Sequence, residues 1–355
     1  MKVRAALARV VNPATGRNIV AEGMVQGLSA TEAGVVRFTL DAGGTDPKAA
    51  EALLEAAKRE ASSVEGVARV VAFGTSHQTA PPPRGGHDNP MGLAKQARIG
   101  AAADYLPGVR NVIAVASGKG GVGKSTIAAN LAVAFATAGL STGLLDADIY
   151  GPSLPTLFGL KDRPAVRDGK VIPAEAFGVR AMSIGLLVDQ NKALAWRGPM
   201  VMGAMRQLMS DVAWGPLDAL VVDTPPGTGD VHLTLAQSKK VTGAVIVSTP
   251  QEMALADVRR GVELFRTVKV PILGVIENMA WIDLPGGGRQ YVFGEGGAER
   301  AARELDAPFL GAVPLYQELR EASDAGAPIV ASAPDSPAAK AVVAIADRLR
   351  TTFTA

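Results

Sequence analysis

The sequence predicts an α/β fold built on a parallel sheet, preceded by a small α+β domain. From residue 111 onward, short apolar runs alternate with helical patterns, as expected when helices cover both faces of a parallel sheet. The first of these runs leads directly into glycine-rich sequence and then into a helical pattern. Residues 1–75 lack this alternation, so a separate small domain is expected there.

The small domain is expected to contain two helices and three strands. A helical pattern over 3–11 stops at Asn12-Pro13. A second helix starts at Asp46-Pro47, where proline suits the first helical turn, and ends near residue 62. The expected strands are 19–25, 35–40 and 67–73, with a turn at 32–34 between the first two.

Residues 76–107 form a proline- and glycine-rich stretch without periodicity, which predicts an extended linker. One short amphipathic segment is expected inside it, between Leu93 and Tyr105. The remaining residues, 108–355, are expected to form the larger domain. Its predicted strands are 112–116, 143–145, 219–222, 244–247 and 272–276.

Composition narrows the class of protein. Hydrophobic residues make up 48% of the 355 residues and charged residues 20%, and the net charge of +2 is too balanced to indicate nucleic-acid binding. No run reaches the roughly 18 apolar residues of a membrane span, and Asn12-Pro13 interrupts any signal-peptide core. A cytoplasmic location without a membrane partner is therefore expected. The absence of cysteine excludes disulfides, a thiolate nucleophile and a thiolate metal site.

The most specific motif is a phosphate-binding loop. It follows the first predicted strand of the larger domain and consists of Gly118, Lys119, Gly120, Gly121, Val122, Gly123, Lys124 and Ser125, with Thr126 next. Such glycines let successive N–H groups point at phosphate oxygens, and the helix N-terminus adds its dipole. Lys124 is expected to reach the β- and γ-phosphates and Ser125 to ligate Mg²⁺. The fold class is therefore that of a parallel-sheet P-loop NTPase that uses ATP and Mg²⁺.

Acidic residues follow two further strands of the same domain. Asp146 and Asp148 end the run at 143–145, where carboxylates beside a phosphate loop can hold metal-bound waters and orient an attacking water. Asp223 ends the run at 219–222 and fits a residue that holds Mg²⁺ through water. Gly227, in the proline–glycine loop that follows, can offer its N–H to the γ-phosphate. His232 is expected to be structural.

These motifs together resemble the deviant-Walker ATPases, which include MinD, ParA and the Mrp/ApbC family. The residues 118–126, GKGGVGKST, carry the second lysine of that class, DADIYGPS at 146–153 is similar to its switch I, and DTPPGTGD at 223–230 to its switch II. The resemblance implies an ATP-bound homodimer in which Lys119 crosses to the partner's nucleotide. It also implies that Asp148 positions the hydrolytic water, that Asp146 supports the metal shell, and that Asn278 contacts the adenine edge.

The Mrp/ApbC resemblance extends from about residue 111 to residue 350. The segment 313–326 is similar to the family's base-side loop, with Tyr316 where many relatives carry an acidic residue. Residues 1–75 resemble the small iron–sulfur assembly domain that often precedes the ATPase. Together they imply an ATP-hydrolysing iron–sulfur cluster carrier that binds a [4Fe–4S] cluster and passes it to apo client proteins.

The sequence departs from that family at the cluster ligands. Relatives usually carry a Cys-x-x-Cys shortly after the segment that contains Asn278, whereas residues 281–291 contain no cysteine. Asn12-Pro13-Ala14 stands where Asp-Pro-Glu is usual, and His77, His87 and His232 are the chain's histidines. Iron–sulfur clusters are held overwhelmingly by thiolates, so these residues do not support stable cluster binding of the family type.

Two other functions compete with that of a cluster carrier. A MinD- or ParA-like positioning ATPase would use its dimer to bind a membrane or DNA, and residues 337–353 could form an amphipathic helix for that purpose. The apolar residues of this segment are mostly alanine and valine, so a helix packed on the domain is expected instead. Electron transfer of the nitrogenase-iron-protein kind is excluded by the absence of cysteine.

Overall fold

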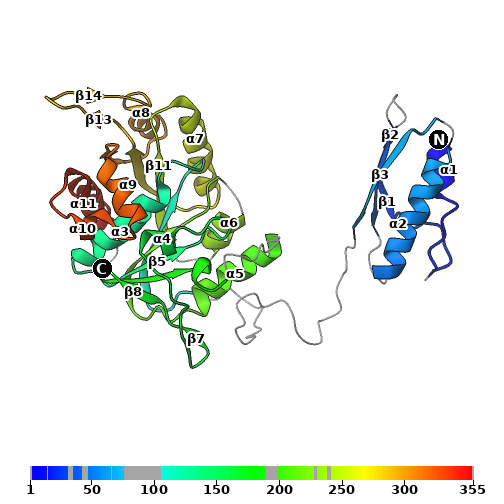
Figure 1. The fold of residues 1–355 in the computed structure, drawn as a ribbon, viewed down its shortest axis with the longest axis horizontal. Coiled ribbons are helices and arrows are strands. Elements are labelled where there is room, and N and C mark those ends of the chain that lie inside the picture. The colour runs from blue at the N-terminus through cyan, green and yellow to red at the C-terminus, as the bar shows by residue number, and fades with distance from the viewer. Residues whose placement is uncertain are drawn as a thin grey trace. The chain divides into compact units, whose positions relative to one another are not determined.

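The computed structural model describes residues 2–13, 15–30, 35–41, 47–64, 66–75, 105–188, 198–227, 230–237 and 241–353. It separates into two compact units, Met1–Asp88 and Asn89–Ala355, the boundary lying inside the stretch predicted as a linker (Figure 1). The linker and its predicted amphipathic segment fall almost entirely outside the described residues.

The N-terminal unit is a three-stranded sheet with two helices. Its strands are β1 (Val25–Ala30), β2 (Val35–Asp41) and β3 (Arg69–Thr75), in the order β1-β2-β3, and its helices are α1 (Lys2–Leu7) and α2 (Pro47–Ser62). β1 pairs antiparallel with β2, and β2 pairs parallel with β3. Leu7, Leu40 and Ala57 are fully buried in its core. The helix expected over residues 3–11 is shorter in the structure, where α1 ends at Leu7.

The strand predicted at 19–25 is wrong for most of its length. Residues 19–23 form turns, and β1 begins only at Val25. The Asn18 side chain accepts the N–H of Ala21 at 2.7 Å, and Gly23 has a φ of +71°. An asparagine side chain that bonds the backbone ahead of it favours a turn over a strand. The apolar residue Ile19, which contributed to the strand prediction, is buried in the core from a turn and not from a strand.

The C-terminal unit is built on an eight-stranded sheet in the order β15-β12-β11-β4-β10-β5-β9-β8. All neighbours pair parallel except β8 with β9. The strands are β4 (Val109–Ala116), β5 (Thr142–Asp146), β8 (Ala174–Ala176), β9 (Val179–Ser183), β10 (Leu217–Asp223), β11 (Val241–Ser248), β12 (Ile272–Asn278) and β15 (Phe309–Val313). Each run predicted as a strand in this domain lies inside an observed strand, whereas β8, β9 and β15 were not predicted.

Helices cover both faces of this sheet (Figure 1). One face carries α5 (Gly198–Ser210), α6 (Asp230–Gln237), α7 (Glu252–Thr267) and α8 (Gly297–Glu304); the other carries α3 (Lys124–Thr137), α4 (Leu154–Leu157), α9 (Gln317–Asp324), α10 (Ile329–Ser332) and α11 (Pro337–Arg350). Val112 and Ala114 of β4 pack into the first layer, Ile113 and Val115 into the second. Because both faces are buried, β4 is apolar at every position from Val112 to Ala116.

Two short hairpins lie outside the central sheet. β6 (Val166–Arg167) pairs with β7 (Lys170–Val171), and β13 (Ile282–Asp283) pairs with β14 (Arg289–Gln290). The second hairpin begins four residues after the carboxyl end of β12 and therefore leaves the sheet near the P-loop edge.

The predicted C-terminal helix is confirmed as a packed element. α11 begins after Ser336, whose hydroxyl accepts the N–H of Ala339 at 3.1 Å as an N-cap. The helix lies beside α3, and Phe353 beyond its end meets Phe135 edge-on with ring centroids 5.1 Å apart. Its apolar side is therefore committed to the core. Among the helices that the structure describes, none is both long and apolar enough to cross a membrane.

Candidate nucleotide-binding site

The phosphate loop joins β4 to α3 and has the glycine conformations that its sequence requires. Gly121 and Gly123 have φ values of +79° and +80°, where side chains are rarely tolerated. A Cβ atom on Gly123 would also stand 2.2 Å from Nδ2 of Asn278. That same Nδ2 donates to the carbonyl of Val122 at 2.8 Å, and Val122 is itself buried. Asn278, the last residue of β12, therefore holds the loop in place.

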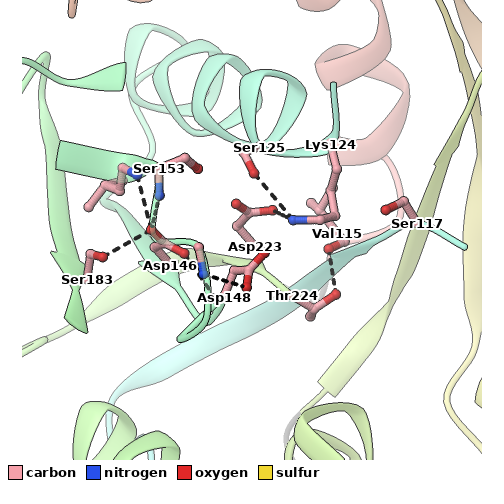
Figure 2. A network of polar contacts seen from close by, with 12 residues as sticks. Val115, Ser117, Lys124, Ser125, Asp146, Asp148, Ser153, Ser183, Asp223 and Thr224 are labelled. Carbon is pink, nitrogen blue, oxygen red and sulfur yellow. Dashed lines mark hydrogen bonds and ion pairs between the residues drawn. The ribbon is translucent and has the colours of Figure 1, made fainter. Parts of the chain in front are cut away.

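The first residue of α3, Lys124, forms a buried ion pair with Asp223 at the carboxyl end of β10 (Figure 2). The two side chains are 6% and 4% exposed. The ammonium group also lies 3.3 Å from Oγ of Ser125. A lysine, a hydroxyl and a carboxylate therefore meet at the mouth of the loop, as the motif predicts.

Asp146, at the end of β5, is fixed by four hydrogen bonds. Its Oδ1 accepts the N–H of Asp148 at 3.1 Å. Its Oδ2 accepts the N–H groups of Ser153 and Leu154 at 2.9 and 3.1 Å and the hydroxyl of Ser183 at 3.0 Å (Figure 2). Burial, and then the charge of Asp223, raise the pKa of Asp146 to about 7. Only Oδ1 keeps capacity for a metal-bound water, because three donors already occupy Oδ2.

Asp148 lies on the loop after β5 and is only partly buried. Its Oδ1 accepts the N–H of Gly151 at 3.2 Å. Burial raises the pKa of Asp148, and the nearby positive charge of Lys124 opposes that rise. A carboxylate of this kind, held by backbone N–H groups and still open to solvent, can accept a hydrogen bond from a water molecule.

The loop after β10 is tied back to the phosphate loop. The N–H of Gly227 donates to the carbonyl of Ser117 at 2.8 Å, so the group predicted to contact a phosphate here bonds the residue that follows β4. Thr224 donates its hydroxyl to the carbonyl of Val115 at 3.0 Å. His232 Nε2 lies 3.0 Å from that hydroxyl oxygen and must supply the hydrogen, since the threonine proton is already used. Buried at 1% exposure, His232 has the structural role that was predicted.

Orphaned polar atoms mark where a base would fit. Asn278 Oδ1 and Thr249 Oγ1 are buried and have no hydrogen-bond partner among the described residues. Each comes from the carboxyl end of a strand, β12 for Asn278 and just beyond β11 for Thr249, and these two strands are neighbours. A buried polar atom without a partner costs about 1–3 kcal/mol. A bound base with hydrogen-bonding edges would remove that cost, so the residues present fit a nucleotide.

Lys119 differs from Lys124 in its surroundings. Its side chain is partly exposed and makes no hydrogen bond or ion pair to any residue in the described part of the chain, although its carbonyl accepts the Ser117 hydroxyl at 2.9 Å. The structure thus gathers Lys124, Ser125, Asp146, Asp148 and Asp223 around one loop. The Lys119 side chain forms no hydrogen bond or ion pair with these residues.

Comparison with known proteins identifies the family. The family model described as NUBPL iron-transfer P-loop NTPase, of the ParA type, matches residues 108–350. The chain belongs to the NUBPL iron-transfer P-loop NTPase family. Membership in this family makes it a nucleotide-hydrolysing protein. A second model, described as iron–sulfur cluster assembly protein, matches residues 1–72.

Sequence similarity to individual proteins supports the assignment to the NUBPL family. The iron–sulfur cluster carrier protein of Aquifex aeolicus is 52% identical over 245 residues, which cover 68% of this chain and 67% of that protein. The mouse iron–sulfur cluster transfer protein NUBPL is 48% identical, covering 73% and 80%. A nucleotide-binding protein of Archaeoglobus fulgidus, solved in complex with ADP, is 43% identical with a TM-score of 0.57, covering 64% and 91%. MinD of Pyrococcus furiosus, at 22% identity, a TM-score of 0.51 and coverage of 68% and 98%, shows the fold alone.

Where relatives of the NUBPL family were expected to carry cysteines, this chain has a polar and aromatic hairpin. Asp283 accepts hydrogen bonds from Trp281 Nε1 at 3.0 Å and from the Tyr316 hydroxyl at 3.2 Å. The Arg289 guanidinium lies 3.9 Å from the centre of the Trp281 ring. No cluster of three or more histidine, cysteine, aspartate or glutamate side chains suited to a metal exists within the described residues. These residues do not fit an iron–sulfur cluster.

Two residues that hold this NTPase site were given no role from the sequence, although Ser153 is the last residue of the switch I segment. Ser183 contributes its hydroxyl to Asp146 from β9, a strand that was itself missed. Ser153 contributes a backbone N–H to the same carboxylate, and its own hydroxyl is buried without a partner among the described residues. A serine carries no spacing signal of its own. Only the pairing of Asp146 with Ser183 across β5 and β9 brings them together.

Proposed function

We propose that this chain is a Mg²⁺-dependent ATPase that acts as a homodimer in the delivery of iron–sulfur clusters. The observation that carries the proposal is the gathering of Lys124, Asp146, Asp148 and Asp223 at the phosphate loop of a NUBPL-family chain. Relatives at about half identity are named iron–sulfur cluster carrier or transfer proteins. We also propose the cytoplasmic location that the sequence led us to expect.

Phosphate binding would replace one partner of Lys124 with another. The ammonium group, now paired with Asp223, would turn to the β- and γ-phosphates, which offer the same negative charge. Bound Mg²⁺ would supply charge neutralisation of the phosphate oxygens. Ser125 would ligate this ion directly, while Asp223 and Oδ1 of Asp146 would hold its water ligands. The freed Asp223 therefore serves the metal only when Lys124 serves the phosphate.

Hydrolysis would then proceed by attack of one water molecule on the γ-phosphorus, with the bond to the β,γ-bridging oxygen breaking to give ADP and phosphate. Asp148 would orient that water and accept a hydrogen bond from it. The N–H of Gly227 would exchange the Ser117 carbonyl for a γ-phosphate oxygen and so report whether that phosphate is present. Asn278 Oδ1 would accept a hydrogen bond from the adenine amino group, which guanine lacks at that position.

The iron–sulfur cluster is the cargo of this ATPase and not its resident cofactor. With no cysteine in the chain, cluster ligands would come from the donor and acceptor proteins, and this ATPase would act on their complex. The nucleotide would regulate that assembly through dimerisation, with Lys119 reaching the partner's nucleotide. The N-terminal unit, matched by the iron–sulfur assembly family, is the natural part to contact apo clients.

The proposal is tested by two measurements on the full-length protein. Anaerobic incubation with iron and sulfide, followed by desalting and iron counting, should leave an iron-free protein that still hydrolyses ATP. In a second assay, ATP should accelerate cluster transfer from a loaded scaffold protein to an apo acceptor. Retained iron with absorption near 400 nm would overturn the cargo argument, and absent hydrolysis would overturn the ATPase.

Asp148→Ala tests the catalytic assignment. This variant should bind ATP as the unchanged protein does and lose at least about 100-fold in kcat, since the water would no longer be oriented. Asp162→Ala, at an exposed aspartate of the same unit, is the matched control and should keep full turnover. Comparable kcat values in both variants would show that Asp148 does not position the water.

A further inference from the structure

One oxygen atom joins two segments that are distant in sequence. Oδ2 of Asp146 binds the N–H groups of Ser153 and Leu154, which begin α4, and the hydroxyl of Ser183, which ends β9. Asp146 and Ser183 are paired across neighbouring parallel strands, and Ser183 is fully buried. The carboxylate therefore fixes the starts of two different elements at once (Figure 2).

Ser183 forms a second hydrogen bond, which connects Asp146 to the helix that follows β9. Its Oγ accepts the N–H of Gly185 at 3.1 Å and so caps the short 3₁₀ helix η1 (Ile184–Leu186). The hydroxyl thus donates its one proton to Asp146 and accepts one from η1. Any displacement of Asp146 Oδ2 changes the position of this cap.

The two anchored segments line one cavity. This cavity has a volume of about 720 Å³, and Pro155 and Thr156 of α4 line it together with Gly185, Leu186 and Leu187 of η1 and its end. Lys161 and Asp324 also line it. α4 bonds to Oδ2 of Asp146 directly, and η1 is linked to the same oxygen through the Ser183 hydroxyl. The same carboxylate therefore holds both this part of the cavity lining and the proposed metal site.

We infer that Ser183 is a positioning residue that orients Asp146 for the metal site and couples that site to the η1 wall of the cavity. This inference rests on the proposed Mg²⁺·nucleotide site at the phosphate loop. Without the Ser183 hydroxyl, Oδ2 keeps two backbone donors and the carboxylate can rotate, while η1 loses its cap. A hydroxyl that only stabilised the fold would affect the free energy of unfolding and nothing else.

The first experiment separates positioning from stability. Ser183→Ala should raise the Mg²⁺ concentration for half-maximal hydrolysis about fivefold, the effect of one hydrogen bond, and should leave the affinity for fluorescent ADP in EDTA within twofold. Thr142→Val is the matched control, because Thr142 is also buried, stands at the opposite end of β5 from Asp146, and donates its hydroxyl to the Leu140 carbonyl at 3.0 Å. Ser183→Thr, which keeps the hydroxyl, should restore the Mg²⁺ dependence. An unchanged Mg²⁺ dependence in Ser183→Ala, or an equal shift in Thr142→Val, would overturn the inference.

The second experiment reads the cavity wall directly and uses the absence of native cysteine. Leu187→Cys places a single thiol on the η1 wall, and Lys161→Cys places one on the exposed part of the same lining. Mg²⁺·ADP should slow maleimide labelling of Leu187→Cys by more than about threefold, because a ligand stabilises the arrangement that binds it. Labelling of Lys161→Cys should be unaffected.

Adding Ser183→Ala to Leu187→Cys should abolish this protection under conditions where ADP binding is verified by fluorescence. Protection that survives in the double variant would show that Ser183 does not couple the two sites. A protein that binds Mg²⁺·ADP and shows the coupling but does not hydrolyse ATP would contradict the proposed ATPase and leave this inference standing.

Discussion

At the scale of single residues, the site depends on charges that the fold buries in pairs. Lys124 and Asp223 are each less than a tenth exposed and neutralise one another. Removing one member of a buried pair leaves an uncompensated charge, whereas replacing both by neutral groups of similar size is often tolerated. The pair therefore contributes both to nucleotide binding and to the stability of the nucleotide-binding unit.

Lys124→Met should abolish ATP binding and lower the free energy of unfolding by about 3–5 kcal/mol. Adding Asp223→Asn should recover most of the stability and none of the binding, because the phosphate ligand is still absent. Urea unfolding and isothermal titration of ATP measure the two quantities. Equal stability of the single and double variants would show that the buried charge is not what destabilises Lys124→Met.

The buried carboxylate of Asp146 predicts a pH dependence of stability. Its pKa lies at about 7 in the fold, raised from 3.8 by burial and by Asp223, with Asp148 and Lys124 also nearby. The folded state then binds a proton that the unfolded state releases, so its contribution to stability is greatest below pH 4, falls as pH rises, and is lost above about pH 7. Asp146→Asn should flatten the decline in unfolding free energy between about pH 4 and pH 7. A decline as steep as that of the unchanged protein would assign it to other groups.

The sequence predicted the charged residues of the site better than the residues that orient them. Lys124, Asp146 and Asp223 stand at fixed distances from strands that are apolar on both faces, so their meeting at one sheet edge could be anticipated. Ser183 could not be anticipated, because β9 contains Arg180 and a serine and shows no continuous apolar run. The bond between Asp146 and Ser183 depends on strand order, which local pattern does not encode.

At the scale of elements, side-chain contacts hold the hairpin β13–β14. Asp283 joins Trp281 and Tyr316, and Arg289 stacks on the indole. The sequence alone attaches no consequence to Tyr316 at a position where many relatives carry an acidic residue. The structure gives it one, since its hydroxyl ties the loop after β15 to this hairpin.

Asp283→Ala should loosen the hairpin without destabilising the unit. The side chain of Asp283 is about half exposed, so its loss should change the free energy of unfolding by less than about 1 kcal/mol. Trp281 should become more accessible to acrylamide quenching, with Trp281→Phe used to subtract the other two tryptophans. Quenching that is identical before and after the substitution would mean that the Asp283 bonds do not hold the indole.

At the scale of the whole molecule, the side chain of Lys119 in the phosphate loop has no polar partner within the described part of its own chain. Lys124 is buried and paired, whereas the Lys119 side chain contacts no polar group within the described residues. A lysine so close to a phosphate site, in a loop that Asn278 holds in place, is suited to a negative charge outside its own chain. The proposed homodimer supplies that charge as the partner's nucleotide.

Lys119→Ala should therefore remain folded and bind ATP as a monomer, but fail to dimerise and lose most of its turnover. Asp148→Ala provides the background in which bound ATP should persist, so light scattering after gel filtration with Mg²⁺·ATP should report a dimer for Asp148→Ala and a monomer once Lys119→Ala is added. Lys161→Ala, which removes an exposed lysine from the same unit, should leave the dimer intact. An ATP-dependent dimer that persists without Lys119 would refute its crossing role, and the loss of turnover would then have to arise within one chain.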